Sequence, residues 1–171
     1  MNYEIGDEVK DIQERIENDA AKLDEVVKSI IYPYCKDLDK CVESIKTIMQ
    51  DTKNPPTAQE LDDMCIKLPI YIYYASAMQE QLGIKSDISK ALYKEMYHSS
   101  RDKLDKGTVA DKDSLAELAS QQEALVSMLY SRAYSTVKAK VSAAQELLSS
   151  TKKVVTRRIT EMELTRISGG N

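Results

Sequence analysis

The most restrictive feature of this sequence is the long stretch 108–166, which contains neither glycine nor proline. These residues are the usual helix breakers, so a helix can continue wherever apolar residues recur at helical spacing. They do recur here, at Leu115, Leu118, Leu125, Leu129, Val137, Ala144, Leu148, Val155, Ile159 and Met162. The stretch therefore predicts a long C-terminal helix, which at 1.5 Å per residue would reach ~80 Å if unbroken. We expect any bend near Ser149–Thr151, where hydroxyl side chains compete for backbone hydrogen bonds.

The rest of the chain is also poor in helix breakers, with five glycines and four prolines among 171 residues. Charged residues make up 30% of it, and no region alternates polar and apolar residues in the manner of a strand. Both properties favour amphipathic helices over sheets. We therefore expect an all-α fold, an elongated helical bundle that forms one compact domain or one domain with an extension.

The first helix is expected over residues 5–30, where apolar residues repeat in heptads. The repeat comprises Ile5, Val9, Ile12, Ile16, Leu23, Val26 and Ile30, and Asp19 is its one polar interruption. A heptad seam of this kind pairs helices and can mediate oligomerisation through a partner copy. The alternative is a narrow amphipathic helix that lies on its own domain.

Proline and glycine set the next boundaries. Pro33 is expected to break or kink the first helix, so that a second helix covers about 34–50. The segment "DTKNPPT" predicts a loop, after which Thr57 and Glu60 fit a capping box. The third helix is then expected to run to about Leu82, with a kink at Pro69 and with Gly83 as its C-terminal cap.

A fourth helix is expected over about 87–104, with Asp87 as its N-cap, and Gly107 separates it from the last one. Thr108 and Asp111 offer a cap for that last helix. By sequence the chain divides into an acidic helical segment 1–53, a helical core 57–167 and a flexible tail 168–171.

Charge is distributed unevenly along the chain. The net charge is −4, but residues 1–65 hold 16 acidic and 8 basic side chains, whereas residues 66–171 hold 12 and 16. Between residues 132 and 160 there are seven bases and a single acid, Glu146. The basic C-terminal part is therefore the candidate for contact with a polyanion.

The sequence gives little support for catalysis, and we expect no enzyme, no metal and no cofactor. His98 is the only histidine and has no nucleophile or acid at a recognisable spacing, so it is interpreted as a surface or helix-flank residue. The three cysteines form no C-x-x-C pair and are interpreted as buried thiols. The acidic pairs at 37/39 and 62/63 look like solvated faces. The chain begins without a signal peptide and has no membrane-length apolar run, which predicts a cytoplasmic protein.

Binding is better supported, because rings and cations are interleaved at helical spacing. On the expected last helix, Tyr130, Tyr134 and Lys138 form one row of residues four apart. Aromatic faces beside a cationic groove are what single-stranded nucleic acid requires. The alternative is that the tyrosines edge the core and the lysines only solubilise. The candidate nucleic-acid-binding residues are Lys90, Lys94, Arg101, Lys103, Tyr130, Arg132, Tyr134, Lys138, Lys140, Lys152, Lys153, Arg157 and Arg158.

Part of the chain also resembles a known family. Over about residues 68–162, the segments "YYASAM", "IKSDISKALYKEMYHSSRDK" and "TVADKDSLAEL" precede a helix with tyrosines and bases. This layout resembles the recombination mediators of T4-like phages (the UvsY type) and related small helical phage proteins. The most specific piece is "ADKD" followed by Leu115. Residues 1–65 match nothing in the family, and an acidic total replaces its basic character.

The resemblance implies a non-enzymatic phage accessory factor of DNA recombination or replication that works in the host cytoplasm. Such a factor binds single-stranded DNA, contacts a phage recombinase and a single-strand-binding protein, and assembles as a ring-like homo-oligomer. Its DNA-binding residues would correspond to Lys90, Lys94, Arg101 and Lys103, extending to Arg132 and Lys138.

Two other functions remain open. The chain could be a helical assembly protein of a phage virion, or an adaptor that uses the seam of residues 5–30. It could also be a small phage inhibitor of host defence, whose acidic half imitates the charge of nucleic acid.

Overall fold

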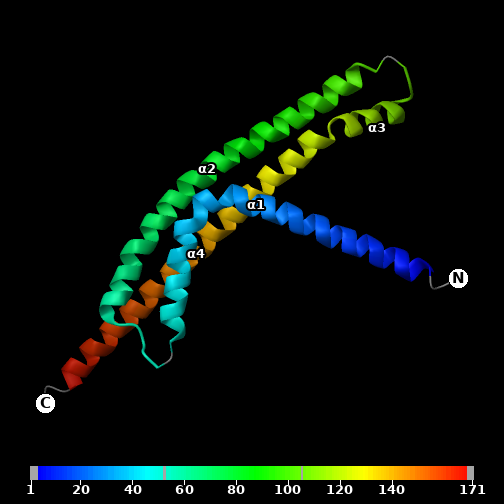
Figure 1. Cartoon of the computed structure of the whole chain (residues 1–171). Coiled ribbons are helices and arrows are strands. Elements are labelled where there is room, and N and C mark those ends of the chain that lie inside the picture. Colours follow the sequence, from blue (N-terminus) through cyan, green and yellow to red (C-terminus); the bar gives the residue numbers. More distant parts are fainter. Residues whose placement is uncertain (1–3, 52, 105, 169–171) are drawn as a thin grey trace. The chain divides into compact units, whose positions relative to one another are not determined.

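The computed structural model describes residues 4–51, 53–104 and 106–168, with the side chains of residues 4–8 and 168 left aside. The described residues form four helices and no strand, which confirms the all-α fold (Figure 1). The helices are α1 (Glu4–Gln50), α2 (Ala58–Asp102), α3 (Val109–Ala119) and α4 (Gln121–Ser168). The expected seam residue Ile5 lies in α1, but its side chain is outside the described set, as is the expected tail beyond Ser168.

Two helices, α1 and α2, are longer than the sequence suggests, because two expected breaks do not occur. Pro33 lies inside α1, so the helices expected at 5–30 and 34–50 are one. The side chains on either side of it, Ile31 and Cys35, are both buried, so packing offsets the backbone hydrogen bond that the proline removes.

Gly83 likewise lies inside α2, with Leu82 and Ser86 buried on either side of it. The prediction that Gly83 ends a helix was wrong, and so was the prediction that Asp87 begins one. A Cβ added at Gly83 would lie 3.2 Å from Cε2 of Tyr134. The glycine therefore serves close helix packing and not termination.

One unexpected break divides the stretch 108–166. Ser120 separates α3 from α4, with φ −102° and ψ 11°. Its hydroxyl is buried and donates to the carbonyl of Ala116 at 2.8 Å, which competes with the regular helical pattern. The bend considered at Ser149–Thr151 produces no interruption of α4, although Thr151 makes the same kind of bond to Leu147 at 2.9 Å.

The predicted capping box at Thr57 and the predicted cap at Thr108 are both confirmed. The hydroxyl of Thr57 accepts from the backbone N–H of Glu60 at 3.2 Å, and the Glu60 carboxylate accepts from the backbone N–H of Thr57 at 2.7 Å. These bonds hold the pKa of Glu60 below its usual value. Thr108 and Asp111 form the same reciprocal pair at the start of α3. Gly107 just before it has a φ of 120°, which only glycine adopts without strain.

The chain packs as two compact units, each assembled from separate segments. Unit 1 comprises residues 1–33 and 82–135, and unit 2 comprises residues 34–81 and 136–171. Helices α1, α2 and α4 each contribute to both units, so these units cut across the sequence-based division at the loop 51–57. In unit 1 the second half of α2 runs alongside α3 and the start of α4 (Figure 1).

The cores of the two units differ in the size of their side chains. Unit 2 buries large apolar residues, including Leu38, Ile45, Leu61, Met64, Leu68, Ile72, Val137 and Val141. Unit 1 buries mostly small ones, namely Ser86, Ser89, Ala116, Ser120, Ser127 and Ala133, together with Val27, Ile31 and Leu82. Small residues let helices approach closely, and the hydroxyls of Ser86 and Ser131 lie 3.1 Å apart.

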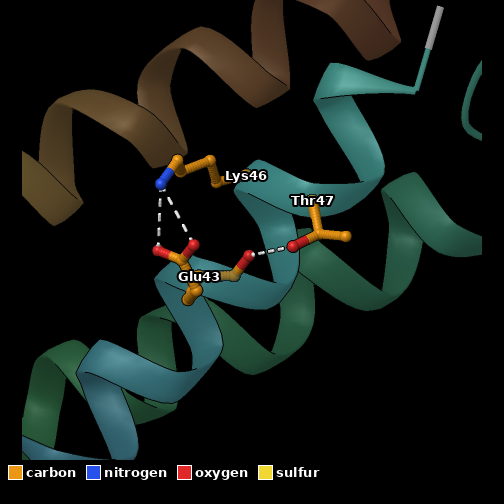
Figure 2. Close-up of polar contacts among 3 residues, drawn as sticks. All are labelled: Glu43, Lys46 and Thr47. Atoms are coloured by element: carbon orange, nitrogen blue, oxygen red, sulfur yellow. Dashed lines mark hydrogen bonds and ion pairs between the residues drawn. The ribbon is translucent and has the colours of Figure 1, made fainter.

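Many lysines of α1 are paired within the helix and solvent-exposed. Lys46 donates to both carboxylate oxygens of Glu43, at 3.0 and 3.3 Å, while Thr47 donates to the Glu43 carbonyl at 2.9 Å (Figure 2). Exposed pairs three or four residues apart contribute only a few tenths of a kcal/mol, roughly 0.3–0.5. They show that the acids of α1 neutralise its own bases locally.

Candidate nucleic-acid interface

The two tyrosines of the predicted row, Tyr130 and Tyr134, are half-buried on α4 in unit 1. The Tyr134 ring packs against the backbone of α2 at Gly83, since a Cβ there would lie 3.2 Å from its Cε2. That part of the ring is covered by protein, so no base can stack on it. The row of residues 130, 134 and 138 is therefore only partly available as a stacking surface.

On α2, the predicted base Arg101 has a structural contact. Its Nε lies 2.7 Å from Oδ1 of Asp113, and the Tyr97 hydroxyl donates to the same oxygen at 3.2 Å. The pKa of Tyr97 is raised above its usual value, mainly by desolvation and next by this hydrogen bond to a carboxylate. Because Asp113 belongs to α3, the cluster fastens α3 to the end of α2.

The same end of α2 carries a row of rings. Tyr93 and Tyr97 have centroids 6.4 Å apart, and His98 meets Tyr97 edge-on at 5.4 Å. His98 is exposed on this helix, as the sequence interpretation expected. Of the predicted bases here, Lys90 lies 3.5 Å from Asp87, whereas Lys94 and Lys103 are exposed.

Two predicted bases of α4 hold unit 2 together. Lys140 Nζ lies 2.7 Å from Oδ1 of Asp39 on α1. The Arg158 guanidinium donates to the carbonyl of Pro56, in the loop before α2. Both side chains are half-buried. They tie α4 to the other segments of its unit, so they are poorly placed for a ligand.

Four other predicted bases of α4 share its solvent face. Lys138, Lys152, Lys153 and Arg157 are all exposed, and at 3.6 residues per turn they fall within an arc of roughly 140°. The opposite side of the helix carries the buried stripe Val137, Val141, Ala144 and Thr151. We call these four residues the basic face of α4.

Few acidic residues lie close enough in α4 to neutralise the basic face. Within α4, Glu146 is the sole acid from residue 138 to 157. Arg157 Nε lies 2.7 Å from Oε1 of Glu161, one turn further along, and this pair is open to solvent. Among the described residues, Lys138, Lys152 and Lys153 show no ion pair. The remaining predicted base, Arg132, is exposed on α4 in unit 1.

Two highly exposed rings on α2 are ones that the sequence interpretation did not select. Tyr73 and Tyr74 on α2 are 72% and 61% exposed, with centroids 5.6 Å apart in an edge-on arrangement. They belong to a second apolar stripe on α2, opposite its buried one, which also includes Ile66, Ile70, Ile84, Ile88 and Leu92. Helical spacing applied to residues 66–92 reveals two apolar stripes, and this signal could have identified them.

The described residues offer few other groups that could carry chemistry. Within the described ranges no group of three or more His, Cys, Asp or Glu could hold a metal ion. Burial raises the pKa of the Cys35 and Cys41 thiols, which favours their unreactive neutral form. In the part of the chain that the structure covers, no helix combines the length and apolarity needed to cross a membrane.

Comparisons with known proteins give no further guide, since no family model, curated protein or solved structure matches the chain.

Proposed function

We propose that this protein is a non-enzymatic accessory factor of phage DNA recombination or replication that binds single-stranded DNA as a homo-oligomer. In this proposal, the basic face of α4 supplies the contacts to phosphates. The recombinase and the single-strand-binding protein are the proposed protein partners. The observation that carries the proposal is the segregation of charge on α4, where four exposed bases lie opposite the buried stripe.

The arrangement supports contact with a backbone more than reading of bases. Lys152, Lys153 and Arg157 are grouped within two turns, and Lys138 lies ~20 Å away along the same helix at 1.5 Å per residue. Between them the exposed positions are small or polar, such as Ser142, Gln145 and Ser149, and Glu146 is the one acid on this side. A flexible single strand can follow such a row, whereas little there could read base edges.

Self-association has separate support in the exposed apolar side chains. Large apolar residues that are at least half exposed occur on every helix, among them Ile16, Ile70, Leu118 and Met162. Soluble monomers rarely leave extended apolar patches in water, and burial of each such side chain contributes roughly 1.5–3 kcal/mol. A second copy of the chain could bury these exposed apolar side chains.

The test is fluorescence anisotropy with a labelled single-stranded oligonucleotide over a series of salt concentrations. The variant K138A/K152A/K153A/R157A removes the basic face. A matched control, K28A/K46A/K53A/K106A, removes four exposed lysines elsewhere and gives the same net charge. With about four phosphate contacts, the slope of log K against log[salt] should be roughly −3 for the wild type and the control, and near zero for the variant. Equal binding by all three proteins would exclude the basic face.

The second candidate function is that of a helical adaptor or virion assembly protein. It is favoured by the exposed apolar stripe of α2, opposite its buried stripe, which is suited to a helical partner and not to a polyanion. This function predicts stable association with no affinity for nucleic acid. Absence of any anisotropy change at low salt, together with a stable oligomer, would support it over the first.

A further inference from the structure

The core stripe of α1 continues past the elements that cover it in unit 1. Val27 and Ile31 are buried at 6% and 7% exposure, and Leu23 is half-buried. About two and three turns further toward the N-terminus, the same side of the helix is in water, with Ile16 62% exposed and Ile12 55%. We call Val9, Ile12, Ile16 and Leu23 the α1 seam. A shallow groove of about 490 Å³ runs along it, between Ile12 and Leu23.

The core stripe of α4 runs out in the same manner in unit 2. Ala144 and Thr151 are buried, but Ile159 is 48% exposed and Met162 is 61% exposed on the same side of the helix. Here α4 continues past the start of α2 (Figure 1). The result is an apolar groove of about 790 Å³, which we call the α4 groove; its lining includes Pro56, Leu61, Val155, Ile159 and Met162.

We propose that the α1 seam of one molecule docks in the α4 groove of a second molecule. Each surface lacks a covering helix, and each is a direct extension of a helical core stripe. The seam spans the 15 residues 9–23, and the α4 residues that line the groove span the 12 residues 155–166, so their lengths are similar, ~22 and ~18 Å. The α1 seam of one molecule then covers the apolar side of α4 that is exposed in the other.

Charge complementarity supports this occupant. Residues 4–26 carry nine acidic and three basic side chains, whereas residues 152–166 carry five basic and two acidic ones. Of these five bases, Arg158 and Arg166 line the α4 groove, and the other three belong to the basic face. At the grooves themselves, side chains of both signs are present on each surface. The charged residues that line the α1 groove are Arg15 and Asp19, and those that line the α4 groove are Asp62, Arg158, Glu161 and Arg166. Arg15 can therefore meet a carboxylate, and Asp19 can meet Arg166.

Pairing of two α1 seams with each other is less favourable in the parallel arrangement. Asp19 occupies a seam position of the heptad, so a parallel pair sets two Asp19 carboxylates against each other without a counter-ion. The α1–α4 contact is heterologous, because each molecule offers two different surfaces. Repetition of such a contact builds a ring or an open chain and not a closed dimer.

This interface specifies the self-association on which the proposed function rests. Two substitutions at exposed positions test it, Ile16→Asp in the seam and Met162→Asp in the groove. Because both side chains are more than 60% exposed, neither change should disturb the fold, which circular dichroism checks. The matched controls, Asn18→Asp and Thr160→Asp, place the same new charge on the opposite side of the same helices.

Molecular mass is measured by light scattering in the absence of nucleic acid, so failure here is distinct from failure of DNA binding. The wild type and both controls should form assemblies larger than a dimer. Each seam or groove variant alone should fall to the monomer mass of 19.3 kDa.

An equimolar mixture of the two variants decides the geometry. Ile16→Asp retains an intact groove and Met162→Asp retains an intact seam, so the mixture should form a one-to-one dimer that cannot grow. If the mixture stays monomeric, or if either variant alone keeps the wild-type mass, the proposed contact is wrong. A wild-type chain that is monomeric at all concentrations would also overturn it.

Discussion

The contact between Gly83 and Tyr134 allows a quantitative test of whether Tyr134 is a packing residue or a free ring. In an α-helix, exchange of glycine for alanine stabilises by about 0.8–1.0 kcal/mol through backbone entropy. Gly83 lies in the interior of α2, so Gly83→Ala should gain this amount unless the new methyl meets an obstacle. In the wild type that methyl would lie 3.2 Å from Cε2 of Tyr134, and the ring must retreat by a few tenths of an ångström.

We therefore expect the gain from Gly83→Ala to depend on residue 134. In the wild-type background, the tight contact should offset most of the gain and leave a change of less than about 0.5 kcal/mol. In a Tyr134→Ala background the obstacle is gone, and the full gain of about 1 kcal/mol should appear, which for a chain of this size is about 2–4 °C in Tm.

The assay is urea denaturation followed by circular dichroism, with all four proteins of the cycle at one concentration, because self-association shifts apparent stability. The coupling energy between the two substitutions measures the contact. If Gly83→Ala stabilises equally in both backgrounds, Tyr134 does not pack on α2. The Tyr134 ring would then be free to stack on a base.

Three further predictions follow from single contacts. Asp113→Ala removes the ion pair with Arg101, in which both side chains are roughly 40% exposed, and the hydrogen bond from Tyr97. We expect the free energy of unfolding, measured by urea denaturation, to fall by about 1–2 kcal/mol. An unchanged free energy of unfolding would mean that this cluster does not fasten α3. Because the pKa of Tyr97 is raised in the folded protein, the unfolded chain loses the phenolic proton at a lower pH than the folded one. The free energy of unfolding should therefore fall as pH rises above about 10. In urea denaturation at a series of pH values, Tyr97→Phe should show a shallower fall. Cys35 is fully buried and burial raises the pKa of its thiol, so it should react with a disulfide reagent only on unfolding. Cys65 is partly exposed and should react in the native state. Equal reaction rates of the two thiols would contradict the assigned burial.

The predictable parts of this fold are those set by neighbours in the sequence. Both predicted caps were correct because Thr57 with Glu60, and Thr108 with Asp111, satisfy each other's hydrogen bonds within one turn. The helical class was correct because it depends on the scarcity of breakers. The loop 51–57 was correct because Pro55 and Pro56 leave few alternatives.

Helix ends were predicted poorly wherever packing outweighs local preference. Pro33 and Gly83 are breakers by propensity, yet each is flanked by buried residues that keep the helix continuous. Ser120 has the opposite effect, since its buried hydroxyl turns to a carbonyl where an exposed serine would face water. The heptad of α1 also drifts, because Val27 and Ile31 are buried where Val26 and Ile30 were expected; a helix of 3.6 residues per turn does not keep a 3.5 repeat.

For the candidate site, the sequence located the basic region but could not separate its members. The partner of Lys140 is 101 residues away, and that of Arg158 is 102 residues away. No local pattern reports such contacts, so structural and solvent-facing bases look alike in the sequence. Only the structure distinguishes the basic face of α4 from the bases that hold unit 2 together.

The most direct test of the proposed function is photo-crosslinking from the basic face itself. Ser149 is exposed on that side of α4, close to Lys152 and Lys153, and Thr47 is an exposed position on α1 in the same unit. With p-benzoylphenylalanine at either site and a labelled single-stranded oligonucleotide, we expect a crosslink from position 149 that disappears at high salt, and none from position 47. Binding without a crosslink at 149, or equal crosslinking from both positions, would contradict the assignment of the basic face.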